Sequence, residues 1–369
     1  MKGFVIIAIV MIHVFIVCGT ESVGDVTESG GFPLYLQAIY TGLMMFFIAS
    51  GYFFRPGRGY LTNVLKRVVP LGVALVVCVL VLPLILFCWL AVLGQSPDLS
   101  QYPYIIGRLA GSEALFLPFD TWIYEPPTLD TTNGYYFLEI MFVSFIVFYA
   151  IADFSTRSFG IFATVTTALL TSSAFLIEVV DVRLPMYGEL VPMATAFMLV
   201  GAYAGKRSLA EWMESGWWLK RSGWAMFAAL FAVSAVVVFL FPPGNNFDSS
   251  QLGAYGGWSV YPFFVLGCSV SFFFLMFFAV LTRSRIVSRS LGFVGKHTLG
   301  ILLGHVLGMK MIISLFYRLD SVKYMSPGIP SVTVFLFGIA DVMLCLAAIL
   351  CAFRLAGKAR KQFRINPNV

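Results

Sequence analysis

Ionisable side chains inside long apolar runs are the residues of this sequence that can do chemistry. His13, Glu139, His305, Lys310 and Asp341 each lie within such a run. An ionisable group in a membrane-spanning helix costs roughly 2.5–3.5 kcal/mol on insertion scales, so each one requires a reason. The five side chains can line one polar cavity, or each can form a buried hydrogen bond between helices.

His13 has the strongest case for chemistry. It lies about ten residues into the first apolar run, which at about 1.5 Å per residue places it near the centre of a roughly 30 Å hydrocarbon core. Imidazole can accept a proton near neutral pH, and burial disfavours its charged form. A neutral base at this depth fits the activation of a hydroxyl for attack on a thioester.

A basic segment, residues 55–67, follows the second apolar run and contains Arg58, Lys66 and Arg67. Such a segment can be a cytoplasmic anchor that meets anionic lipids. Its charges can equally hold the phosphates of a nucleotide-bearing donor such as coenzyme A. The residues alone leave both interpretations open.

Other common chemistries lack their motifs. The sequence has no nucleophile elbow, phosphate-cradling glycine loop, dinucleotide fingerprint or His-Glu-x-x-His site. The six cysteines lie in or at the end of apolar runs and have no metal-ligand spacing, which disfavours zinc and disulfide frameworks. We therefore expect no bound metal.

Composition indicates that lipid is the main solvent of this chain. Of its 369 residues, 59% are apolar and 11% are charged, whereas a soluble domain has about a quarter charged. The net charge of +6 comes from basic clusters between the apolar runs rather than from one soluble face. This pattern indicates membrane topology and no nucleic-acid partner.

The apolar runs predict an all-α polytopic membrane protein that forms a single domain, residues 1–369, with about ten spans. Lys and Arg concentrate in alternate connections, which predicts that both termini are cytoplasmic and that the aromatic-rich segment 94–134 faces outward. Gly300, Gly304 and Gly308 form a stripe that favours close helix packing. The predicted spans are 3–19, 33–54, 69–93, 135–152, 159–179, 188–205, 223–241, 261–281, 298–317 and 331–354.

Four stretches together resemble the bacterial acyltransferase family 3, whose members are multi-spanning enzymes that modify surface glycans. Residues 2–13 resemble its opening helix, with Lys2 eleven residues before His13. Residues 45–54 resemble its Phe-rich helix with a Ser-Gly-Tyr ending, which runs into the basic segment closed by Pro70. Residues 134–139, ending at Glu139, and 291–305, a Gly-Lys-x-Thr-Leu turn into a helix with a histidine, resemble two further motifs.

The resemblance implies an acyl donor, usually acyl-coenzyme A in the cytoplasm, with no other cofactor bound. It also implies an acceptor hydroxyl on the outer side, on a glycan or glycolipid, and a catalytic role for His13. Lys2 stands where the family commonly has arginine, and Lys66 and Arg67 are the basic pair nearest Pro70, whereas Arg55 and Arg58 have the family spacing but lie earlier. The expected site residues are then Lys2, Arg58, Lys66 and Arg67 for the donor, and Glu139, His305 and Asp341 in the polar cavity.

Two main functions are compatible with these observations. The first is an O-acyltransferase of the inner membrane that moves an acetyl or similar small acyl group onto a glycan hydroxyl. The alternative is a transporter or flippase of a glycan or another polar metabolite, since about ten helices with charges near the midplane also suit transport. Matching helices broken by Pro or Gly in two halves would favour transport, and the sequence does not contain them.

Overall fold

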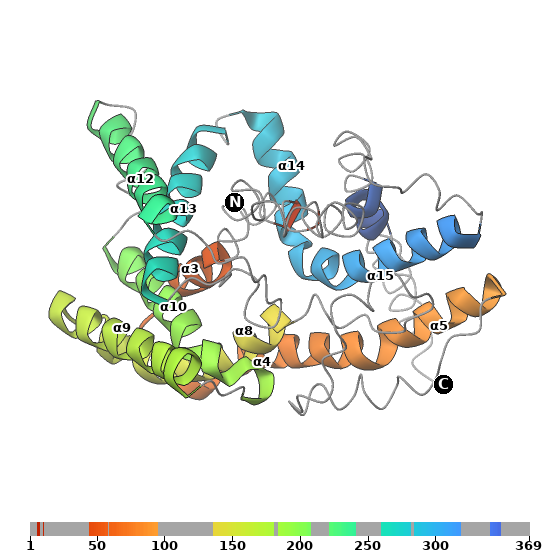
Figure 1. Ribbon diagram of the computed structural model, residues 1–369, viewed down its shortest axis with the longest axis horizontal. Coiled ribbons are helices and arrows are strands. Elements are labelled where there is room, and N and C mark those ends of the chain that lie inside the picture. Colours follow the sequence, from red (N-terminus) through yellow and green to blue (C-terminus); the bar gives the residue numbers. More distant parts are fainter. Residues whose placement is uncertain are drawn as a thin grey trace, which may run out of the picture. The chain divides into compact units, whose positions relative to one another are not determined.

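The computed structural model describes the protein as a set of helices (Figure 1). Every regular element within the described residues is helical, as the apolar runs predict. The number of spans and the cytoplasmic position of both termini stay predictions. The described residues are 6–7, 10, 44–57, 59–94, 136–180, 184–207, 221–240, 260–281, 284–318 and 340–347.

Four helices in the described part of the chain are long and apolar enough to cross a bilayer. They coincide with predicted spans three, four, five and eight. Many large apolar side chains on these helices are exposed, including Leu61, Val73 and Leu84. Lipid is the environment that accommodates such a surface. The four helices are Tyr60–Val92, Phe137–Ser155, Phe159–Ile177 and Val260–Phe277.

The first of these helices begins at Tyr60, whereas the apolar pattern predicts a span from residue 69. It consists of α4 (Tyr60–Val76), the π-helical turn η1 (Val77–Val81) and α5 (Leu82–Val92). The end of the basic segment is therefore the start of the helix, because Lys66 and Arg67 continue a helix as well as apolar residues do. Pro83 is the second residue after η1, and the π turn accommodates the backbone hydrogen bond that proline cannot donate.

The chain divides into two compact units, of which the larger is Val23–Ser284. Helix α10 (Val191–Lys206) packs there against α3 (Met44–Tyr52), α8 (Tyr136–Ser155), α9 (Phe159–Ala174) and α13 (Val260–Leu281). Helix α4 packs against α8, and α12 (Arg221–Leu240) packs against α13. The centre of this unit is the α10 helix, most of whose residues from Val191 to Ala202 are buried.

Three glycines allow α3 and α10 to approach at backbone distance. A Cβ atom at Gly51 would overlap the carbonyl of Met198, and a Cβ at Gly201 would overlap the carbonyl of Ile48. A Cβ at Gly205 would lie 2.6 Å from the carbonyl oxygen of Tyr52. Small residues at such contacts are the usual basis of tight helix pairs in membranes. Gly51 of the Ser-Gly-Tyr stretch thus has a packing role.

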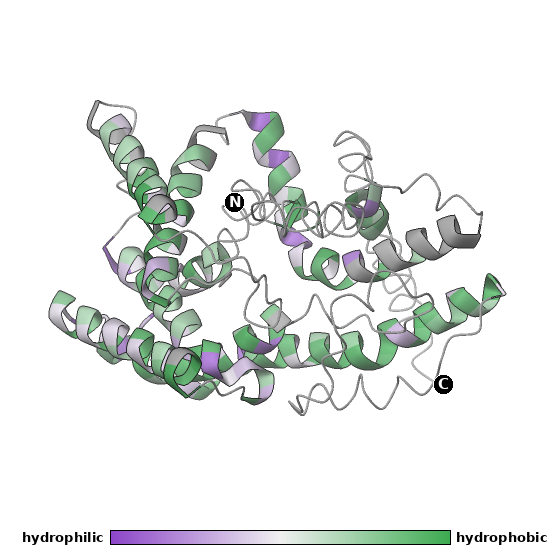
Figure 2. Ribbon diagram, in the orientation of Figure 1, coloured by the Kyte–Doolittle hydropathy of each residue, from purple (hydrophilic) through white to green (hydrophobic). Residues whose placement is uncertain are grey.

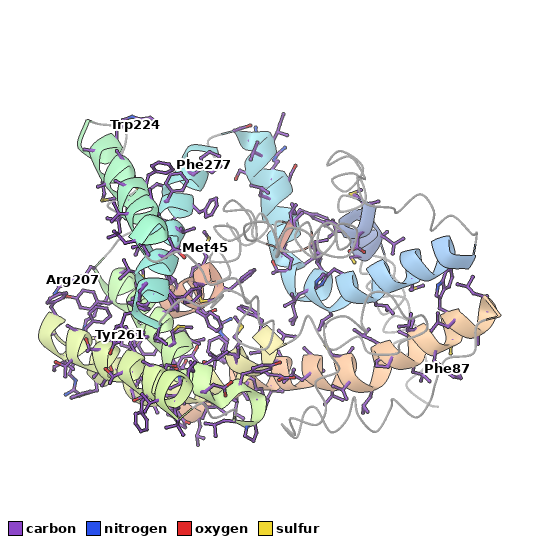
Figure 3. All side chains as sticks on the ribbon, viewed as in Figure 1. Met45, Phe87, Arg207, Trp224, Tyr261 and Phe277 are labelled. Atoms are coloured by element: carbon purple, nitrogen blue, oxygen red, sulfur yellow. The ribbon has the colours of Figure 1, made fainter. Side chains whose placement is uncertain are left out.

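A polar contact also links α13 to α9. The hydroxyls of Tyr261 and Thr171 share a hydrogen bond of 2.6 Å, and Figure 3 shows Tyr261 beside these helices. Because the hydroxyl of Thr171 also donates to the carbonyl of Thr167 at 2.9 Å, the hydroxyl of Tyr261 is the donor in this pair.

The smaller unit comprises Met1–Ser22 and Arg285–Val369. Its described part contains α14 (Arg285–Lys296), α15 (Thr298–Arg318) and the helical segment 340–347. A Cβ at Gly304 would lie 3.1 Å from Sγ of Cys345, and one at Gly308 would overlap the carboxylate of Asp341. These two glycines therefore pack α15 closely against segment 340–347, as predicted from the Gly-x-x-x-Gly stripe.

Candidate functional site

Glu139 is a buried carboxylate in the first turn of α8, with an exposed fraction of 4%. It interacts electrostatically with Cys78, which is buried in the π turn η1. Helices α4 and α8 pack together, with Gly72 leaving 3.3 Å between a notional Cβ and the ring of Phe142. The helix that begins with the basic residues thus also carries a buried thiol, Cys78, which interacts electrostatically with Glu139.

Lys66 and Arg67 lie near the other end of that helix and are exposed. Cys78 lies eleven residues after Arg67, which corresponds to about 17 Å along the helix axis. One helix therefore joins an exposed pair of cations to a buried polar position.

Glu189 is a second buried carboxylate in this unit, and it was missed in the sequence-based prediction. It lies in η5 (Pro185–Leu190), a short 3-10 turn that packs against α8, and its exposed fraction is 5%. The backbone N–H of Leu184 donates to its Oε2 at 2.9 Å, and the hydroxyl of Ser173 donates to its carbonyl oxygen at 2.6 Å. Glu189 falls inside predicted span 188–205, so the test of ionisable residues in apolar runs would have found it.

The backbone at η5 is strained where it precedes Glu189. Met186 and Tyr187 both have φ of 55°, in the left-handed region that non-glycine residues seldom occupy. Tyr187 is buried, with an exposed fraction of 8%, so packing holds this conformation. Strain of this kind costs about 1–3 kcal/mol per residue and is concentrated at functional sites.

His305 and Asp341 lie in the smaller unit, on the two elements that Gly304 and Gly308 bring together. Both are buried. Nδ1 of His305 lies 2.6 Å from the carbonyl oxygen of Leu302. Because a carbonyl only accepts, Nδ1 carries the proton, and the acceptor of the neutral ring is Nε2.

The carboxylate of Asp341 has one hydrogen-bonded oxygen and one without a partner. The thiol of Cys345 donates to Oδ1 at 3.8 Å, one helical turn away. Oδ2 has no hydrogen-bond partner among the described residues. Burying a polar atom without a hydrogen bond is costly.

The remaining predicted site residues, His13, Lys2 and Arg58, lie outside the described residues. Glu139 belongs to one unit and His305 and Asp341 to the other, and the common polar cavity stays a prediction. In the part of the chain with described positions, no three His, Cys, Asp or Glu side chains gather as metal ligands do.

In the part of the chain that the structure describes, long apolar helices with exposed apolar surfaces and buried ionisable groups indicate a membrane protein. The family model described as an acyltransferase domain matches residues 1–352 and therefore extends over both units. The chain belongs to this family, acyltransferase family 3, and is an acyltransferase. No curated protein and no solved structure matches it in parallel comparisons.

Proposed function

We propose that this protein is an O-acyltransferase of the inner membrane. It transfers an acetyl or similar small acyl group from acyl-coenzyme A in the cytoplasm to a hydroxyl of an extracytoplasmic or lipid-linked glycan. The match of the acyltransferase family over residues 1–352 carries the proposal. Exposed cations and a buried polar position on one helix support it, because they suit a donor with a charged nucleotide and a long arm that ends in a thioester.

Donor binding follows from the charges at the start of the Tyr60–Val92 helix. Arg67 has a planar guanidinium with several hydrogen-bond donors, and Lys66 has a compact positive charge. Both side chains are exposed, so they can bind the phosphates of coenzyme A. Lys2 and Arg58 add positive charge to the same proposed cytoplasmic side. The pantetheine arm then extends along the helix toward the membrane interior.

The chemical step uses His13 as a general base. Its imidazole takes the proton of the acceptor hydroxyl while the hydroxyl oxygen attacks the carbonyl carbon of the thioester. The carbon–sulfur bond breaks as the tetrahedral intermediate collapses, and the thiolate of coenzyme A receives the proton from the imidazolium. The products are the acyl ester of the glycan and free coenzyme A.

Labelled acetyl-coenzyme A supplied to inverted membrane vesicles tests this function. Vesicles containing the protein should transfer label to glycan, and vesicles from cells that lack it should not. Label that stays in coenzyme A, in vesicles where glycan still crosses the bilayer in a protein-dependent manner, would contradict acyl transfer and favour the transporter or flippase.

A further inference from the structure

Helix α14 is amphipathic, and none of its apolar side chains is buried in the described part of the structure. Ile286 is 78% exposed and Phe293 is 41% exposed. These two side chains lie seven residues apart, which is two helical turns, so they share one strip of the helix surface. An amphipathic helix of a water-soluble protein would bury such a strip against a core.

Three cations form a second strip beside the apolar one. Arg285, Arg289 and Lys296 are exposed and are spaced by four and seven residues, so they line up along the helix. At 3.6 residues per turn, the two strips lie roughly 70° apart around the helix axis. The helix contains no Asp or Glu. Figure 2 shows hydrophilic and hydrophobic residues interleaved along α14.

Along the sequence, α14 lies between two apolar helices. Three residues separate it from α13, and His297 alone separates it from α15. The joint to α15 is closed by backbone N–H of His297 donating to the carbonyl of Val294 at 3.0 Å and by the hydroxyl of Thr298 donating to the carbonyl of Gly295 at 2.9 Å. Twelve residues span about 18 Å, too short for a roughly 30 Å core.

We propose that α14 lies in the surface of an anionic membrane. Ile286 and Phe293 insert among the acyl chains, and Arg285, Arg289 and Lys296 bind anionic lipid headgroups. Its length, its exposed apolar strip and its lack of acids match helices that lie at the boundary between headgroups and acyl chains. Cations next to a membrane span are drawn to the negative surface of such a membrane. This placement does not depend on the acyl-transfer reaction.

A depth measurement on the full-length protein tests the apolar strip. Ile286→Cys and Ser288→Cys, which lie on opposite sides of α14, are labelled with bimane and reconstituted in phosphatidylcholine vesicles that contain 5-doxyl-phosphatidylcholine. The signal of identically treated wild-type protein, with its native cysteines, is subtracted. We expect at least twofold stronger quenching at position 286 than at 288, and equal quenching would overturn the insertion. If Ile286→Cys does not accumulate, Phe293→Cys reports on the same strip.

The basic strip is tested by changing only the headgroup of the quencher. At low salt, 5-doxyl-phosphatidylglycerol should quench the label at 286 about twice as strongly as the same fraction of 5-doxyl-phosphatidylcholine. The excess should disappear in the triple variant R285Q/R289Q/K296Q and at high salt, where surface charges are screened. Equal quenching by both lipids in the parent protein would overturn the headgroup contact.

Discussion

Of the two histidines singled out in the sequence, His305 is the one whose surroundings the structure describes. His305 is buried in α15, and its Nδ1 is bonded to the carbonyl of Leu302 in the preceding turn. Such a bond fixes the ring against its own helix, which is the usual arrangement of a structural or a positioned imidazole. The catalytic proposal therefore rests on His13, and His305 provides a matched control.

His13→Gln should abolish most of the acyl transfer without unfolding the protein. Glutamine can form hydrogen bonds at this position but cannot take a proton, and a general base typically contributes about 10²–10⁴-fold in rate. We expect glycan acylation in purified membranes to fall by about 10²-fold or more, while the amount and thermal stability of the protein stay normal.

His305→Gln should lower the rate much less than His13→Gln, because the His305 ring is tied to Leu302. Near-normal acyl transfer by the His13→Gln variant would refute the assignment of the base. It would also strengthen the transporter alternative.

Arg67→Ala should weaken the use of acyl-coenzyme A more than Arg58→Ala. Arg67 lies on the helix that continues to Cys78, which interacts electrostatically with Glu139 of α8, whereas Arg58 precedes the helix start at Tyr60. Loss of a guanidinium that grips a phosphate should raise KM for the donor, by about tenfold for a loss of about 1.4 kcal/mol. The measurement is KM for acetyl-coenzyme A in vesicles with equal protein content. Equal effects of the two substitutions would indicate that the segment is only a lipid anchor.

At the scale of elements, one glycine stripe was predicted to pack from its spacing, whereas the glycine contacts between α3 and α10 were not predicted. Gly300, Gly304 and Gly308 were singled out for packing, and Gly304 and Gly308 do pack against segment 340–347. Gly201 and Gly205 have the same four-residue spacing and went unnoticed, although a Cβ at either position would clash with the backbone of α3. Spacing identifies a stripe that can pack, but the partner helix depends on tertiary structure.

Gly201→Ala and Gly160→Ala should change stability in opposite directions. A Cβ at Gly201 overlaps the backbone of Ile48, which cannot move aside, whereas nothing lies within 4 Å of a Cβ at Gly160 in α9. Overpacking costs about 1–3 kcal/mol, while replacing an exposed helical glycine by alanine gains up to about 1 kcal/mol. Heating the detergent-solubilised variants and measuring the fraction that stays monodisperse should give a lower midpoint for Gly201→Ala only. A lower midpoint for both would contradict this role of the contact.

At the candidate site, too, the sequence indicated which residues matter but not which partners they contact. The criterion of ionisable groups in apolar runs correctly marked Glu139, His305 and Asp341 as buried. It could not show that Glu139 interacts electrostatically with Cys78, because this interaction depends on which helices pack. Cys345 and Asp341 instead lie one turn apart on a single helical segment. The left-handed backbone at Met186 and Tyr187 could not be predicted either, because methionine and tyrosine rarely adopt this conformation.

At the scale of the whole molecule, the alternation of basic and acidic connections makes a topological prediction. Reporters fused after Arg67, Arg221 and Arg289 should show a cytoplasmic location, because Lys and Arg are retained in cytoplasmic connections. Fusions within 94–134 and 242–260 should be active only as external reporters. Paired phosphatase and green-fluorescent-protein fusions measure both states. An external result at Arg67 would overturn the orientation and separate Lys66 and Arg67 from a cytoplasmic donor.

The π turn η1 also determines which face of a long helix stays buried. Cys78, Leu82, Leu86 and Leu90 are all buried and follow one another at four-residue steps. In a regular α-helix each such step advances about 40° beyond a full turn, so a stripe of this kind winds away from its neighbour. The wider turn at Val77–Val81 unwinds the helix locally and returns Leu86 and Leu90 toward the line of Leu71 and Leu75. Deleting one residue from this turn would rotate everything beyond it by about 100° and turn the buried stripe of α5 toward the lipid.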